Sequence, residues 1–179
     1  MPPATADAIA PASCSPRAVH AFVGIGSNLA QPLCQIRRAV EAIAQLPQTC
    51  VVARSSLYRS APLGVIARQP HYINAVACVA TTLSADALLR ALQGIERAQR
   101  RRRSTPGAPR SLDLDLLTYG AHQRLGRRLR LPHPRLHRRA FVLKPLLEIA
   151  PGIAIPGRGR ASKFLPRARS QRVSRMTSS

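Results

Sequence analysis

The chain has 179 residues, 45% of them hydrophobic but only 3% aromatic, and it carries a formal charge of +21. This length suffices for one domain with an aliphatic core, and no apolar run approaches the roughly 18 residues that a membrane helix requires. The charge is typical of nucleic-acid binders, yet the aromatic residues that stack on single-stranded bases are scarce, so charge alone assigns no function.

Residues 1–19 precede the first regular pattern of the chain. They lack both the basic start and the sustained apolar segment of a secretory signal, which predicts a flexible leader. The four cysteines show no CxxC spacing and are too sparse for a disulfide framework. We therefore expect a protein of the reducing cytoplasm.

The first half of the chain alternates strand and helix patterns. An apolar run at residues 20–25 ends in Gly-Ser-Asn, which predicts a strand and a turn. Apolar residues spaced three and four apart predict a helix over 32–46, with Pro32 in its first turn. Residues 50–58 and 72–81 are then predicted as two further strands.

The second half repeats this alternation and ends in a basic segment. Ser84 is predicted to cap a helix, a strand ends near Tyr119, and a last helix spans 138–149. The order β-α-β-β-α-β predicts an α+β protein with a ferredoxin-like sandwich, in a single domain over residues 20–156. Residues 157–179 are basic, serine-rich and weakly periodic, which predicts a poorly ordered tail.

Two of the seven acidic residues, Asp113 and Asp115, lie two positions apart in a Leu-Asp-Leu-Asp-Leu segment. In a strand this spacing points both carboxylates to one face, while Leu112, Leu114 and Leu116 point to the other. Two adjacent carboxylates repel each other unless a cation lies between them. A Mg²⁺ ion suits this arrangement, and so does a solvated strand edge whose acids pair with nearby arginines; the pattern alone leaves both open.

Several short motifs follow one another in a fixed order along residues 20–156. They are GIGSNL at 24–29, SLYRSAPLG at 56–64, YINA at 72–75, IE at 95–96, PRSLDLD at 109–115, LPHP at 131–134 and RAFVLKPL at 139–146. This ordered set resembles the 6-hydroxymethyl-7,8-dihydropterin pyrophosphokinases of folate biosynthesis. That family has a ferredoxin-like α/β fold, which agrees with the order of elements above.

The resemblance implies transfer of a pyrophosphoryl group from ATP to the pterin hydroxymethyl group, with release of AMP. Asp113 and Asp115 would hold two Mg²⁺ ions on the triphosphate, and Arg101 and Arg110 would be the catalytic arginines. Such transfers require in-line positioning and neutralisation of charge, which metal ions and guanidinium groups supply. ATP and the pterin would be the partners of a monomeric enzyme, with no membrane and no nucleic acid among them.

The resemblance also implies the residues that bind each substrate. On the ATP side they are Gln93, Glu96, Arg103, Arg128, His133 and Arg139. On the pterin side they are Ser60, Ala61, Leu63, Tyr72, Asn74 and Phe141. Tyr72 and Phe141 would sandwich the ring, and the Asn74 amide would match its donor and acceptor edge.

Two alternatives accompany this hypothesis. The loop over 101–110 is one residue shorter than the familiar form of the family, with Gly107 or a neighbour in place of a tryptophan that closes over the pterin. This departure, together with Pro134 where a tyrosine often stands, is compatible with a degenerate pyrophosphokinase whose lid loop is altered. The other alternative is a basic RNA- or DNA-binding α/β plait, although the aromatic pattern of RNA-recognition domains is absent.

Overall fold

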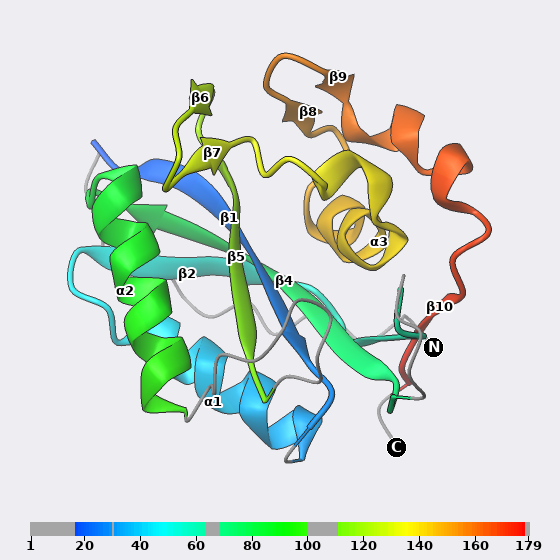
Figure 1. Cartoon of the computed structure of the whole chain (residues 1–179). Helices are drawn as coiled ribbons and strands as arrows, with labels where there is room; N and C mark the ends of the chain where they lie inside the picture. The colour runs from blue at the N-terminus through cyan, green and yellow to red at the C-terminus, as the bar shows by residue number, and fades with distance from the viewer. Residues whose placement is uncertain (1–16, 30, 64–68, 100–110, 178–179) are drawn as a thin grey trace, which may run out of the picture.

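The computed structural model of the protein describes residues 17–29, 31–63, 69–99 and 111–177. In these ranges an antiparallel sheet of six strands carries α1 and α2 on one face and α3 on the other (Figure 1). The strands of this sheet are β1 (Val19–Ser27), β2 (Thr49–Arg54), β3 (Tyr58–Ser60), β4 (Tyr72–Thr81), β5 (Asp113–Tyr119) and β10 (Val173–Arg175). The helices are α1 (Pro32–Ala44), α2 (Ala85–Ala98) and α3 (Ala140–Ile149).

Short elements complete the described chain. They are β6 (Arg124–Leu125), β7 (Arg130–Leu131), β8 (Ala154–Ile155), β9 (Gly159–Arg160) and the 3-10 turns η1 (Leu136–Arg138), η2 (Ala161–Phe164) and η3 (Pro166–Ala168). Strands β6 and β7 form one small hairpin, and β8 and β9 form another. No helix in the described ranges is both long enough and apolar enough to cross a membrane.

The sheet order is β10-β3-β4-β1-β5, and β2 pairs with β4 beyond the end of β3. Strand β4 lies at the centre and is almost wholly buried, because it is covered on both faces. Alternating side chains separate two cores: Ala75 and Ala77 pack with α1 and α2, whereas Val76 packs with Leu143 of α3. The protein is therefore a mixed α/β sandwich with helices on both faces of an antiparallel sheet.

The strand predicted over residues 50–58 is wrong in one respect, because the structure divides it into β2 and β3. Ser55 leaves the regular ladder: its Oγ accepts a hydrogen bond from Val76 N at 2.9 Å. The next residue, Ser56, donates from its backbone N and its Oγ to Glu148 of α3, at 3.1 and 2.7 Å. These side-chain hydrogen bonds replace ladder bonds and break the strand.

The predicted helix ends differ only slightly from the observed ones. Helix α1 begins at Pro32 as expected, and the Ser84 Oγ caps α2 by accepting a hydrogen bond from Ala87 N at 3.3 Å. Helix α3 begins at Ala140 rather than at Arg138, because η1 and an extended Arg139 precede it. This later start places Arg139 at the helix boundary instead of within the helix.

The structure also differs from the expectation of a poorly ordered tail after Gly157. Residues 157–177 contain β9, η2, η3 and β10, and they run beside α3 to the edge of the sheet (Figure 1). Ala161, Ala168 and Val173 are buried in the core around α3. These isolated small apolar residues follow no helical or strand period, so the sequence pattern did not reveal their burial.

Candidate active site

The two acids lie on β5, on the face of the sheet that α3 covers. Leu112, Leu114 and Leu116 are buried on the opposite face, in the core with α1 and α2, which confirms the predicted alternation. Across the sheet, Asp113 pairs with Gly26 of β1 and Asp115 pairs with Gly24. Because glycine has no side chain, the sheet surface beside the acids stays open.

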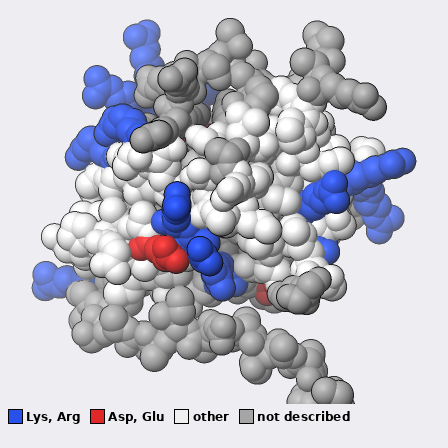
Figure 2. Space-filling model, turned by 90° about the horizontal axis from the view of Figure 1, so that it is seen from below, with Lys and Arg blue, Asp and Glu red and all other residues white. Residues whose placement is uncertain are grey.

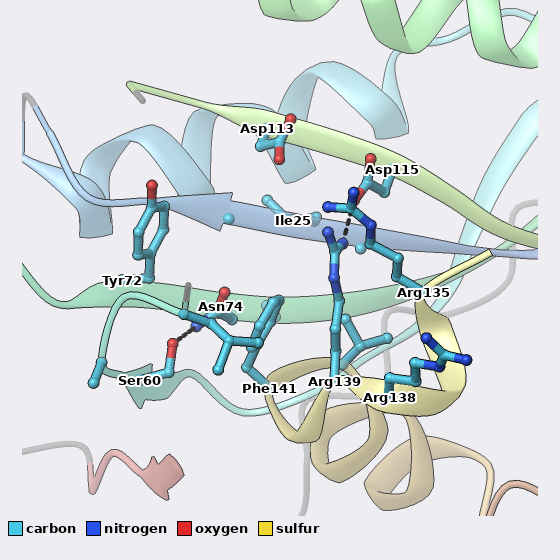
Figure 3. A pocket seen from close by; sticks show the side chains of 16 residues that line it. Ile25, Ser60, Tyr72, Asn74, Asp113, Asp115, Arg135, Arg138, Arg139 and Phe141 are labelled. Atoms are coloured by element: carbon cyan, nitrogen blue, oxygen red, sulfur yellow. Dashed lines mark hydrogen bonds and ion pairs between the residues drawn. The ribbon is translucent and has the colours of Figure 1, made fainter. Parts of the chain in front are cut away.

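The side chains of Arg139 and His133 approach Asp115. The Arg139 Nη1 lies 3.2 Å from the Asp115 Oδ2 (Figure 3), and the His133 Nε2 lies 3.8 Å from the same oxygen. The sequence is compatible with a Mg²⁺ site at the two acids or with a solvated strand edge whose acids pair with arginines. The contact between Arg139 and Asp115 agrees with the second alternative. However, Asp115 stays one-third exposed and lines a cavity, so a ligand reaches it without unfolding of the strand.

His133 is held in one orientation by its own backbone neighbourhood. Its N–H donates to Leu117 O at 2.7 Å, and its Nδ1 accepts from Arg135 N at 3.2 Å. Burial lowers the pKa of His133 first of all, and the charges of Arg139 and Arg135 lower it further, while Asp115 and Asp113 oppose them. A neutral imidazole with Nδ1 as acceptor carries its proton on Nε2, the nitrogen that faces Asp115.

A first cavity of about 380 Å³ lies between β3, β4, β5 and the start of α3. All six residues predicted for the pterin line it: Ser60, Ala61, Leu63, Tyr72, Asn74 and Phe141. Figure 3 shows the rings of Tyr72 and Phe141 on either side of Asn74. The Asn74 Nδ2 donates to Ser60 Oγ at 2.9 Å and to Tyr58 O at 3.3 Å, which fixes the orientation of this buried amide.

A second cavity of about 320 Å³ lies between α2, β5 and the β6–β7 hairpin. Four of the residues predicted for ATP line it, namely Gln93, Glu96, Arg128 and His133. The buried Glu96 also accepts a hydrogen bond from Leu114 N at 2.8 Å. A fifth predicted residue, Arg139, lines the first cavity and reaches the acids from there.

Asp113 and Asp115 are the two residues common to both cavity walls within the described ranges. The acids therefore stand where the two compartments meet. Arg101, Arg103 and Arg110, predicted for catalysis and phosphate binding, lie outside the described residues. In the part of the chain that the structure describes, no cluster of three or more His, Cys, Asp and Glu side chains has metal-binding geometry.

Sequence reasoning missed two arginines of the site. Arg135 and Arg138 line the first cavity beside Arg139, and Figure 3 shows Arg135 extending toward Asp115. Arg135 directly precedes η1 and Arg138 is its last residue, between the LPHP and RAFVLKPL motifs, where no period indicates which side chains share a face. Their position between two site motifs was the available signal.

On the side drawn in Figure 2, the lysines and arginines of the described residues form no continuous face. Lysine and arginine side chains stand there in separate groups with neutral surface between them. A binder that tracks a nucleic-acid backbone needs a connected basic groove. The described residues on this side lack such a connection.

The comparisons with known proteins agree with this geometry. A family model for 7,8-dihydro-6-hydroxymethylpterin-pyrophosphokinase (HPPK) matches residues 22–151. The chain belongs to the HPPK family. It is 47% identical over 135 residues to 2-amino-4-hydroxy-6-hydroxymethyldihydropteridine pyrophosphokinase of Pseudomonas aeruginosa, covering 75% of this chain and 83% of that protein. It is 45% identical over 138 residues to the enzyme of the same name from Haemophilus influenzae, covering 77% and 86%.

Solved structures of larger HPPK proteins share the fold. The chain resembles Plasmodium falciparum HPPK-DHPS in complex with pteroate, with a TM-score of 0.68 at 10% sequence identity. The match covers 86% of this chain and 43% of that one, so the chain spans less than half of the longer protein. The HPPK family match includes both acids and most of the walls of both cavities, and it ends before β8.

Proposed function

We propose that the protein transfers the terminal pyrophosphoryl group of ATP to the hydroxymethyl group of 6-hydroxymethyl-7,8-dihydropterin, as an enzyme of folate biosynthesis. One observation carries the proposal: two cavities, lined by the residues predicted for ATP and for pterin, meet at Asp113 and Asp115. The pterin oxygen attacks the β-phosphorus, the bond from this phosphorus to the α–β bridging oxygen breaks, and AMP leaves. Family membership and relatives at 45–47% identity support the same reaction.

The acid pair is proposed to hold two Mg²⁺ ions with the ATP phosphates. The donor set fits this metal, because Mg²⁺ binds through one or two carboxylates and completes its shell with phosphate and water oxygens. Bound there, the ions supply neutralisation of the phosphate charge. Asp113 and Asp115 lie on one face of β5, opposite Gly26 and Gly24. Because these two glycines have no side chain, they leave space for the ions beside the carboxylates.

The polar and basic residues around the acids are proposed to bind ATP, chiefly through its phosphates. Arg139 is a guanidinium within reach of Asp115, and it can fork onto phosphate oxygens when the triphosphate arrives. The neutral His133 can donate a hydrogen bond from Nε2. Further proposed ATP contacts are Gln93, Glu96, Arg128 and Arg103, with Arg101 and Arg110 as the catalytic arginines.

The pterin is proposed to lie in the first cavity between Tyr72 and Phe141, whose rings would stack on its faces. Because the Asn74 Nδ2 is engaged by Ser60 and Tyr58, the Asn74 Oδ1 is the atom proposed to accept from the N–H edge of the pterin. The peptide groups of Ser60, Ala61 and Leu63 would complete that edge. This arrangement would exclude water from the hydroxymethyl group and aim it at the acids.

The proposal also includes the type of fold, the oligomeric state and the cellular compartment. A ferredoxin-like core over residues 20–156 is supported by two helices on one sheet face and by antiparallel pairing of β1 with both β4 and β5. A monomer in the cytoplasm is proposed as well. Cys34 and Cys78 are free thiols, which suits a reducing compartment.

The decisive experiment is an assay of AMP release from ATP and Mg²⁺, with and without 6-hydroxymethyl-7,8-dihydropterin. The proposal expects AMP and the pterin diphosphate in equal amounts, and only when the pterin is present. Binding of both substrates without AMP would instead indicate the degenerate pyrophosphokinase with an altered lid loop. Affinity for RNA or DNA at physiological salt, with a steep salt dependence, would favour the nucleic-acid alternative.

A further inference from the structure

The N-terminus of α3 receives no cap from its own N-cap residue. That residue is Arg139, with φ −114° and ψ 107°, and its side chain makes no capping hydrogen bond. Helices usually begin at Ser, Thr, Asp or Asn, whose side-chain oxygen accepts from a free backbone N–H. A guanidinium has no acceptor, and that of Arg139 is directed to Asp115 (Figure 3). The helix therefore needs an acceptor from elsewhere in the chain.

Gln171, between η3 and β10, supplies this acceptor. Its Oε1 accepts a hydrogen bond from Ala140 N at 2.8 Å, and its Nε2 donates to Arg138 O at 2.7 Å. These two bonds engage the peptide groups immediately before and after Arg139. One side-chain amide therefore holds, from both sides, the backbone of the residue whose guanidinium reaches Asp115.

The position of Gln171 is fixed by core contacts on both sides of it. Its backbone N donates to Ala168 O at 3.1 Å, and Ala168 and Val173 are both buried against α3. Val173 pairs with Ser60 in the β3–β10 ladder, and Lys144 Nζ donates to Val173 O at 2.6 Å. The Gln171 amide is therefore presented from a packed segment and not from a free tail.

We propose that Gln171 is a positioning residue for the active site, acting through Arg139 and the first turn of α3, which also carries Phe141. The inference rests on the proposed function, since it assigns Arg139 to ATP. Without the Gln171 amide, the first N–H of α3 loses its partner, and the backbone on both sides of Arg139 gains other conformations. The guanidinium would then reach the phosphates from a wider range of directions and bind them more weakly.

The test replaces Gln171 by methionine, which keeps the length of the side chain and removes both hydrogen bonds. Q171M is expected to raise the KM for ATP roughly tenfold and to weaken calorimetric binding of a non-hydrolysable ATP analogue with Mg²⁺ by a similar factor. Gln171→Glu keeps the acceptor for Ala140 N and should recover part of the loss. Gln45→Met makes the same change at an exposed glutamine after α1 and should leave both values unchanged.

A second variant that lowers stability without touching the site distinguishes a positioning role of Gln171 from a merely structural one. Ser84→Ala removes the cap of α2 and should lower the Tm without a comparable loss of analogue affinity. If Q171M lowers the Tm but leaves the KM and the analogue affinity at wild-type values, the positioning role is overturned. A wild-type chain that binds the analogue and releases no AMP would overturn the proposed transfer only, whereas one that binds no analogue would overturn both.

Discussion

The carboxylate of Glu96 accepts a hydrogen bond from the backbone N–H of Leu114, at 2.8 Å, at the residue between the two acids of β5. Glu96 is buried on α2, so this contact ties the helix to the strand that presents Asp113 and Asp115. Residues that orient a ligand-binding pair affect the site nearly as much as the pair itself. Glu96 therefore serves the acid pair as well as lining the second cavity.

Glu96→Ala is expected to lower both stability and activity. It leaves the buried N–H of Leu114 without this acceptor, which costs about 1–3 kcal/mol of unfolding free energy. Glu96→Gln retains an oxygen acceptor and should lose less in a urea denaturation series and in the AMP assay. Equal losses for the two variants would contradict the role of this hydrogen bond.

Asp113→Asn and Asp115→Asn should each reduce AMP release roughly 100-fold or more. A neutral amide binds Mg²⁺ more weakly than a carboxylate, so the ions would no longer neutralise the phosphates and hold them in position. Thermal denaturation should stay close to wild type, since both side chains face a cavity. The control is Glu41→Gln, which removes an exposed partner of Arg37 on α1, a helix that lines neither cavity. Wild-type turnover in either acid variant would eliminate the acid pair as the metal site.

Phe141→Leu should raise the KM for the pterin roughly tenfold, because stacking on one ring face is lost. The KM for ATP should rise less, because Arg139, whose guanidinium lies 5.5 Å from the centre of this ring, keeps its contact with Asp115. Tyr72→Leu should behave in the same way. Phe22→Leu is the comparison, since Phe22 is a partly buried aromatic residue of the core around α3 and does not line the first cavity. Direct titration of the fluorescence of an oxidised pterin reports the affinity without turnover.

Alkaline pH should destabilise the protein through Tyr58. Burial, and then the carboxylate of Glu148, raise the pKa of Tyr58 from 10.0 to about 12. The protonated hydroxyl is therefore favoured in the folded state, and its contribution is complete below about pH 10 and disappears as the pH rises to about 12. The loss is about 2 kcal/mol, so urea midpoints of wild type should fall more steeply over this range than those of Tyr58→Phe.

The features predicted correctly from sequence are those whose signals are local. The Leu-Asp-Leu-Asp-Leu period placed the acids on one face, and the N-cap serine and apolar spacing placed α1 and α2 within a few residues. The residues predicted for the pterin come from three separate segments and all line one cavity, while their role toward the pterin stays a prediction. Their ordered motifs carried this information, because no local pattern brings Tyr72 and Phe141 together.

The features that sequence reasoning missed depend on partners far along the chain. The strand over 50–58 divides because Ser56 bonds to Glu148, and nothing around Ser56 indicates that partner. The segment containing Gln171 is held by isolated contacts of Ala168 and Val173 with α3, which leave no period in the sequence. Arg135, directly before η1, and Arg138, its last residue, were also missed, because a single 3-10 turn has too few residues to show which side chains share a face.

The pairing of β10 with β3 also determines the order in which the site can be assembled during synthesis. Ser174 lies opposite Arg59, and β1, β4, β5 and α3 are all synthesised before this last strand of the sheet. A nascent chain that has reached residue 156 already contains both acids and the described residues of both cavity walls, but it lacks the glutamine that brackets Arg139. The backbone on both sides of Arg139 can therefore be held by Gln171 only after this segment has been synthesised, and the edge of β3 stays unpaired until β10 joins it.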